Sequence, residues 1–231
     1  MANNRQRRLV TARRCARNLL LVIVWPGPRY RVRQVSRQVQ SLAALILSLT
    51  YFGLAQAADE LRVYRDPEFA FVFSYPASWS EQPGLGRNTR VVITAPAGPT
   101  APEANCNVDV RRVPSTLNQT QEQLNRALDG KEFEKDYWLR DMPPNTRVFD
   151  SRKISLGSHA ARTAVLDYSA TVQGYTGYAT QLHLTTLSPG LFFHLVCGSL
   201  GNTPEEGRAG FTIWKATFSR IAQSLKLETT K

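Results

Sequence analysis

Aromatic side chains recur at every second position from Phe69 to Tyr75, and the residues between them are smaller. A period of two is typical of a β-strand that buries one of its faces. Pro76 follows directly and ends the pattern, because proline lacks the backbone N–H that a sheet ladder uses. We therefore predict a strand over residues 68–75, followed by a turn that contains Trp79.

Two further segments in the first half of the chain follow the strand pattern. Residues 90–95 are predicted to form the next strand, and residues 105–113 another. In the second of these, strict alternation places Cys106 on the apolar face. Three prolines between positions 96 and 104 indicate an exposed loop that joins the two strands.

The hydrophobic period changes from two to that of a helix between residues 115 and 140. Leu124 and Leu128 fall at helical spacing, and aromatic residues continue an apolar side after them. We predict one helix near 119–129 and a second, of one or two turns, that ends near residue 139.

Four strands are predicted to follow in succession in the second half of the chain. Only a few residues, glycine among them, separate one strand from the next. Connections this short join antiparallel neighbours. The predicted strands cover residues 147–156, 161–172, 178–187 and 191–198.

The chain closes with a helix that the sequence defines well. Thr203 and Glu206 have the spacing of a capping box, and Pro204 stands at the first helical position. An apolar stripe at helical spacing follows, and we expect it to pack on the sheet. The stripe consists of Phe211, Trp214, Phe218, Ile221 and Leu225.

This order of elements predicts an α+β domain built on an antiparallel β-sheet with packed helices. Residues 71–79, an aromatic strand that ends in proline and tryptophan, resemble the PsbP/Mog-type (PsbP-like) domain family. The turn near Gly157 and the helix end at 221–225 are similar too, and the resemblance covers most of residues 60–228. It implies a three-layer α/β/α sandwich. It also implies a non-catalytic binding or assembly role, since most members of that family are not enzymes.

Charge changes the picture at the N-terminal end. The 231-residue chain has a formal net charge of +11, which would suit a nucleic-acid partner. Ten of its 29 basic residues, however, are arginines within residues 1–40, and the first acidic residue is Asp59. Residues 58–231 therefore hold 19 basic residues against 18 acidic ones. Because the folded part is nearly neutral, we expect no nucleic-acid partner.

The arginines belong to a leader over residues 1–57. An uncharged apolar run at 42–54 follows them, and a small-x-small site ends at Ala57, which together form a secretory signal peptide. We predict cleavage between Ala57 and Ala58, a single exported domain at 58–231, and a periplasmic or secreted location. The alternative is an uncut leader that anchors the chain in the inner membrane through residues 42–57.

Two cysteines remain after the predicted cleavage, Cys106 and Cys197. Both lie in predicted strands on apolar sides, and export would place both thiols in an oxidising compartment. We favour a disulfide between them. The alternative is two buried, unreactive thiols, which are common in protein cores.

The chain offers no recognisable catalytic or metal-binding pattern. Its histidines are His159, His183 and His194, and with Asp150 or Asp167 any of them could build an acid–base or metal site. No ligand spacing connects them, which favours isolated histidines in strands or turns. We therefore predict no catalytic residues, no metal and no cofactor.

Three tyrosines cluster around one predicted hairpin. Tyr168, Tyr175 and Tyr178 could line a groove for a ligand or partner, although ordinary strand tyrosines explain them as well. The sequence as a whole favours an exported, non-catalytic binding or assembly module of the cell envelope. Its partner would be an envelope protein or a small ligand, and it would touch the membrane only through the leader. The alternatives are a small periplasmic, hydrolase-like enzyme and a membrane-anchored envelope protein.

Overall fold

The computed structural model describes residues 60–96, 98, 102–130, 135–140, 142–172 and 174–228. By its contacts the chain divides into Met1–Ala55 and Gln56–Lys231, and every described residue belongs to the second unit. The predicted leader, its cleavage site and the alternative membrane anchor therefore lie outside the described residues. Within the described ranges, no helix has the length and apolar character needed to cross a membrane.

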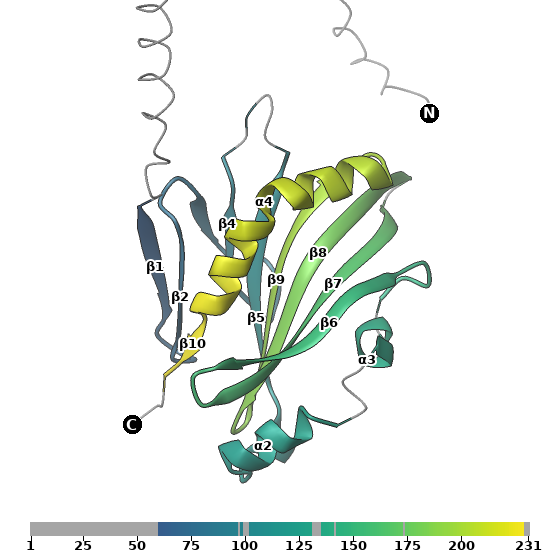
Figure 1. The fold of residues 1–231 in the computed structure, drawn as a ribbon. Helices are drawn as coiled ribbons and strands as arrows, with labels where there is room; N and C mark the ends of the chain where they lie inside the picture. Colours follow the sequence, from purple (N-terminus) through teal and green to yellow (C-terminus); the bar gives the residue numbers. More distant parts are fainter. Residues whose placement is uncertain are drawn as a thin grey trace, which may run out of the picture. The chain divides into compact units, whose positions relative to one another are not determined.

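A seven-stranded antiparallel sheet forms most of the domain (Figure 1). Its strand order is β3-β4-β5-β9-β8-β7-β6, so the four predicted late strands are sequential neighbours on one side. Short β-hairpins join them, as the sequence indicated. The strands are β3 (Ser80–Pro83), β4 (Thr89–Thr94), β5 (Ala104–Arg112), β6 (Arg147–Leu156), β7 (His159–Val172), β8 (Tyr175–Ser188) and β9 (Leu191–Gly201).

A second sheet of three strands, in the order β1-β2-β10, holds β1 (Leu61–Asp66), β2 (Phe71–Pro76) and β10 (Lys226–Leu227). The aromatic strand was predicted to begin at residue 68, but β2 begins at Phe71. The reason is a tight turn held by Asp66, whose Oδ1 accepts hydrogen bonds from the backbone N–H groups of Glu68 and Phe69. Ala70 closes this turn with a left-handed φ of 48°.

The described α-helices lie close to the predicted positions: α2 (Gln121–Ala127), α3 (Lys135–Leu139) and α4 (Pro204–Ser224). A 3-10 turn (Pro114–Thr116), which was not predicted, precedes α2. Thr203 caps α4 by accepting the N–H of Glu206 at 3.2 Å. The predicted capping box is only half formed, because the Glu206 carboxylate accepts from the N–H of Asn202 instead of Thr203.

The main core lies between one face of the large sheet, the small sheet and α4. Helix α4 contacts β8 and β9 as well as β2, and it buries Phe211, Phe218 and Ile221 there. Trp214 is half-buried and stands edge-on to the buried Trp79 at 5.3 Å. The apolar stripe predicted for this helix therefore packs on the sheet.

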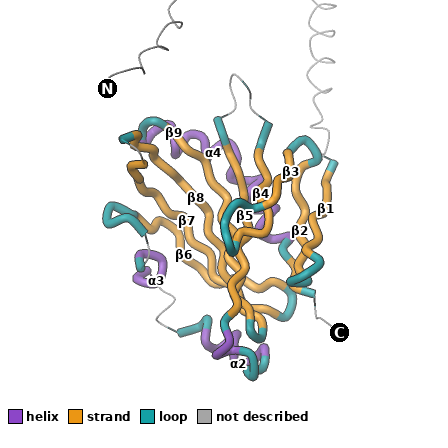
Figure 2. The backbone as a smooth tube through the Cα atoms, turned by 180° about the vertical axis from the view of Figure 1, so that it is seen from behind, coloured by secondary structure: helices purple, strands orange, loops and turns teal. Residues whose placement is uncertain are grey.

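Two short helices contact the strands at the β6–β8 side of the sheet. Figure 2 shows α2 near one end of the sheet and α3 beside β6. Leu124 of α2 packs against Leu187, and Trp138 of α3 packs against Leu166. The antiparallel α+β architecture is thus present and is mostly sheet, while the stacking into three full layers stays a prediction.

Cys106 and Cys197 occupy directly opposite positions on β5 and β9, with their Cα atoms 4.0 Å apart. Their sulfur atoms are joined in a disulfide, which is the pairing that the sequence favoured over two free thiols. Both residues are fully buried in the main core. The bridge therefore ties the two halves of the sheet together from inside the domain.

Candidate functional site

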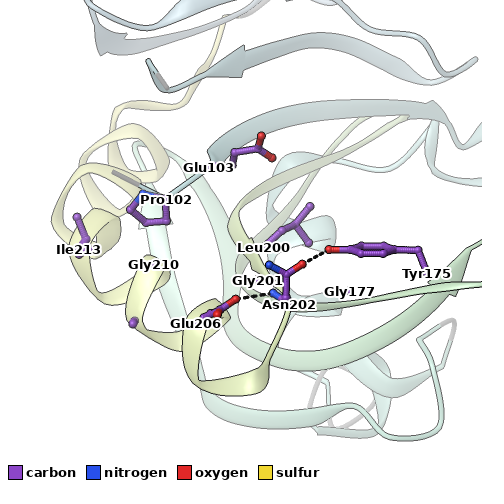
Figure 3. A pocket seen from close by; sticks show the side chains of 11 residues that line it. Pro102, Glu103, Tyr175, Gly177, Leu200, Gly201, Asn202, Glu206, Gly210 and Ile213 are labelled. Atoms are coloured by element: carbon purple, nitrogen blue, oxygen red, sulfur yellow. Dashed lines mark hydrogen bonds between the residues drawn. The ribbon is translucent and has the colours of Figure 1, made fainter. Parts of the chain in front are cut away.

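A hollow of about 660 Å³ opens where the start of β8 and the end of β9 lie beside the start of α4 (Figure 3). Its residues come from three separate parts of the chain: the approach to β5, the β8–β9 region and the first half of α4. The lining consists of Pro102, Glu103, Tyr175, Gly177, Leu200, Gly201, Asn202, Glu206, Ala209, Gly210 and Ile213.

Three large hydrophobic side chains lie exposed around this hollow. Tyr175 is 62% exposed, Leu200 51% and Ile213 59%. A single exposed apolar residue is ordinary on a protein surface, but several gathered on one concave site are typical of an interaction surface. The sheet and the helix contribute to the same surface, because Leu200 lies on β9 and Ile213 on α4.

Hydrogen bonds fix the polar side of the hollow. The hydroxyl of Tyr175 donates to Oδ1 of Asn202, and the backbone N–H of Asn202 donates to Oε2 of Glu206 at 2.8 Å (Figure 3). Because Asn202 connects a strand residue to the first turn of α4, the lining is held in place before any partner arrives. Such preorganisation lowers the entropy cost of binding.

Glycines let α4 lie directly on the strand ends. A Cβ atom at Gly207 would stand 2.8 Å from the carbonyl oxygen of Tyr178, and one at Gly210 would stand 2.2 Å from Oγ of Ser199. Neither contact leaves room for a side chain. The close approach of helix and sheet brings Ile213 to the edge of the hollow.

The hollow carries negative charge. Glu103 and Glu206 are the charged residues among those that line it, and no lysine or arginine stands with them in the described lining. Glu206 lies in the first turn of α4, where the helix dipole already favours an acid. A ligand of this site should therefore combine an apolar part with a positive charge.

The structure distributes the three predicted groove tyrosines over two hollows. Tyr175 lines the large one, whereas Tyr168 and Tyr178 line a separate hollow of about 290 Å³. The three tyrosines do not line one groove, because successive residues of a strand point to opposite faces of the sheet. Tyr175 and Tyr178 are three positions apart on β8, so their side chains lie on different faces. An ion pair between Asp167 and Arg208, 2.9 Å, crosses the smaller hollow.

The interpretation of His183 and His194 as isolated histidines was wrong. Nδ1 of His183 lies 3.0 Å from Nε2 of His194, across β8 and β9. Nε2 of His183 lies 3.1 Å from Oε1 of Gln181, which also accepts the hydroxyl of Tyr168 at 3.0 Å. With both rings neutral, each N–H in this chain of contacts meets an acceptor.

Burial keeps both rings neutral. Desolvation and the neighbouring His194 lower the pKa of His183 to about 3, and desolvation lowers the pKa of His194 to about 4. Neither ring lines the large hollow. Asp167 and Asp150 instead form ion pairs with arginines, so the histidine–aspartate site that the sequence left as the less favoured alternative does not form among the described residues. The contacts of the two histidines form a part-buried hydrogen-bond network across β7, β8 and β9, in which His183 is the most buried member.

Sequence reasoning missed the main features of the large hollow. Leu200 and Ile213 were not singled out, although Ile213 falls outside the apolar stripe of α4 and its exposure could have been anticipated from that. Among the described residues, no cluster of histidine, cysteine and acidic side chains has the geometry to hold a metal ion.

Comparison of the sequence with protein families and with curated proteins gave no match. Comparison with solved structures gave several. The chain is similar to the cyanobacterial PsbP (CyanoP) of Synechocystis sp. PCC 6803. The identity is 14%, the match covers 75% of this chain and 96% of that chain, and the TM-score is 0.47. It is also similar to the Saccharomyces cerevisiae Ran-binding protein Mog1p. The identity is 7%, the match covers 74% of this chain and 96% of that chain, and the TM-score is 0.45.

A further similar structure is LpqN of Mycobacterium tuberculosis, described as involved in cell envelope biogenesis. The identity is 14%, 74% of this chain and 86% of that chain are covered, and the TM-score is 0.42. These neighbours include the PsbP and Mog types that the sequence resembles.

Proposed function

We propose that the chain is an exported, non-catalytic binding or assembly module of the cell envelope, and that it binds its partner at the large hollow. The observation that supports this most directly is the convergence of Tyr175, Leu200 and Ile213 on one preorganised concave surface. Export rests on the leader predicted over residues 1–57 and agrees with the disulfide, since such bridges persist in oxidising compartments.

The proposed occupant is a segment of a partner protein that presents an apolar side chain beside a basic one. The apolar side chain would cover Leu200 and Ile213, and the basic residue would meet Glu103 and Glu206. Apolar contacts at the centre of the site would supply most of the affinity, and the carboxylates at its margin would select the charge of the partner.

A hydrolase-like activity is the weaker candidate. General acid–base chemistry requires a titratable group within hydrogen-bond reach of the substrate. The histidine pair has lowered pKa values and does not line the large hollow, and that hollow holds carboxylates without a histidine, serine or cysteine among its described lining residues.

The proposal predicts charge-selective peptide binding. A labelled peptide whose leucines are flanked by lysines should bind residues 58–231 about tenfold more tightly than the same peptide with glutamates, because only the first complements Glu103 and Glu206. Fluorescence anisotropy measures both dissociation constants. Replacing Leu200 by Ser should weaken binding of the lysine peptide about tenfold, since it removes an apolar contact and leaves the charge of the hollow unchanged.

The matched control is Leu85→Ser, at a leucine that is fully exposed to solvent in the β3–β4 connection and outside the hollow. It should leave the dissociation constant unchanged. Equal binding of the two peptides, or equal losses in Leu200→Ser and Leu85→Ser, would remove the hollow as the binding site.

A further inference from the structure

A second cavity, of about 340 Å³, lies at the β6–β7 and β8–β9 turns, with the turn before β2, the end of β10 and the start of α2 around it. It does not share a residue with the large hollow. Its volume is in the range of small-molecule sites, which are mostly apolar with a few polar groups. The lining consists of Glu68, Phe69, Gln121, Ser158, His159, Ser188, Pro189, Leu191, Phe193, Leu227 and Glu228.

One apolar wall of this cavity is fixed in position. The ring of Phe69 has the guanidinium groups of Arg90 and Arg112 over it, at 4.7 and 5.3 Å from the ring centroid. The backbone N–H of Phe69 donates to the buried carboxylate of Asp66 at 2.8 Å. The next residue, Ala70, holds a left-handed φ of 48°, a conformation that costs energy in a residue other than glycine. The network around Asp66 maintains that strain and keeps Phe69 facing the cavity.

The polar side of the cavity includes a buried histidine. His159 is 8% exposed, and its Nδ1 lies 3.4 Å from Oγ of Ser158. Burial lowers the pKa of His159, so its ring is neutral near pH 7. Gln121 and Ser188 lie on the same lining. These groups can exchange hydrogen bonds with a ligand without carrying charge.

The carboxylates on the lining are already paired. Glu68 forms ion pairs with Arg90 at 2.9 Å and Arg112 at 3.2 Å, and Glu228 forms one with Arg65. The lining thus contributes no unbalanced charge. This contrasts with the large hollow, where two carboxylates have no cation beside them in the described lining.

We propose that this cavity binds a small uncharged organic molecule with an apolar ring or chain and one hydrogen-bonding group. The apolar body would lie against Phe69, Phe193 and Leu227, and the polar group would meet His159 or its neighbouring serine. A charged ligand would lose its hydration shell without gaining an opposite charge, which makes it a poor occupant.

The proposal is tested with three probes that share the indole ring system: neutral indole, anionic indole-3-acetate and cationic tryptamine. In ¹H–¹⁵N NMR titrations of residues 58–231, indole should cause saturable shifts at the amides of Gln121, His159 and Leu227. Each charged probe should bind about tenfold more weakly, because its charge is not compensated. Replacing Ser188 by Phe should fill the cavity and abolish the indole shifts.

The control variant is Ser169→Phe, the same substitution at a serine that lines the smaller tyrosine hollow instead. It should leave the indole titration unchanged, and the amide spectrum of each variant shows whether that variant is folded. Shifts that do not saturate, that spread over the surface, or that are equal for the three probes would overturn the proposal. The peptide experiment on the large hollow is independent of all these outcomes.

Discussion

Lowering the pH from about 7.5 to about 5 is expected to reduce the free energy of unfolding by on the order of 4 kcal/mol, through His183 and His194. Both histidines have folded-state pKa values below their ordinary value of 6.5. As the pH falls through 6.5 the unfolded chain takes up protons on these rings, and the folded chain does not. The unfolded state is thereby favoured.

The size of the effect follows from the difference, or distance, between the solution pH and the pKa of a histidine in the unfolded chain. At about pH 5 that distance is about 1.5 units, which corresponds to roughly 2 kcal/mol for each histidine. The loss continues until the pH reaches the folded pKa values of about 3 and about 4. Protonation of His183 would also place two N–H groups against each other at the 3.0 Å contact with His194.

Other groups around the pair do not reverse this direction. Asp109 raises the pKa of His194 and Arg111 lowers it, and burial remains the largest effect. Asp66 has a lowered pKa, so the stability that it contributes is lost only below the ordinary range of a carboxyl group. The interval between about pH 5 and pH 7 therefore reports mainly on histidines.

Urea unfolding of residues 58–231 at the two pH values measures the prediction. In a variant with His183→Gln and His194→Gln, the difference in unfolding free energy between the two pH values should largely disappear, whatever its absolute stability. His159→Gln should retain most of that difference, because both rings of the pair remain in place with their lowered pKa values. An unchanged pH dependence in the double variant would contradict the assignment.

Replacing both Cys106 and Cys197 by Ala is expected to lower the free energy of unfolding by roughly 2–5 kcal/mol. The bridge spans a sequence separation of 91 residues, so its loss restores considerable freedom to the unfolded chain. Both side chains are also fully buried, and the smaller alanines leave space in the core.

Unfolding curves in urea, with and without a reductant, separate these contributions. Reductant should destabilise the wild-type domain to nearly the level of the double variant and leave the double variant unchanged. Thiol titration of the denatured, unreduced protein should find no free thiol in residues 58–231. A reductant effect of similar size in the double variant would show that the bridge is not its source.

The strands and helices with a clear hydrophobic period could be predicted from the sequence. The β6 strand was predicted with the bounds that it has, Arg147–Leu156, and α4 begins after the predicted cap at Thr203. The β1 strand was missed because it is mostly exposed and carries three charged residues, so it shows no apolar period. Strand β10 is only two residues long and depends on pairing with β2, which no local pattern reveals.

The sites depend on the register between strands and on contacts distant in sequence. His183 and His194 meet only because β8 and β9 pair with Thr185 opposite His194 and His183 opposite Val196. A shift of one residue would turn one ring to the other face of the sheet. Likewise, Pro102 and Ile213 line one hollow although they are far apart in the chain. The alternation within a single strand contains neither kind of information.

The two edge strands of the large sheet determine whether another protein chain can pair with that sheet. All four residues of β3 are exposed, and Pro83 has no N–H to offer a further strand. At the opposite edge, β6 presents charged side chains such as Arg152 and Lys153. Such edges discourage intermolecular β-pairing, so the domain should resist aggregation in a crowded compartment. A partner would then be recognised by side chains in a hollow rather than by extension of the large sheet.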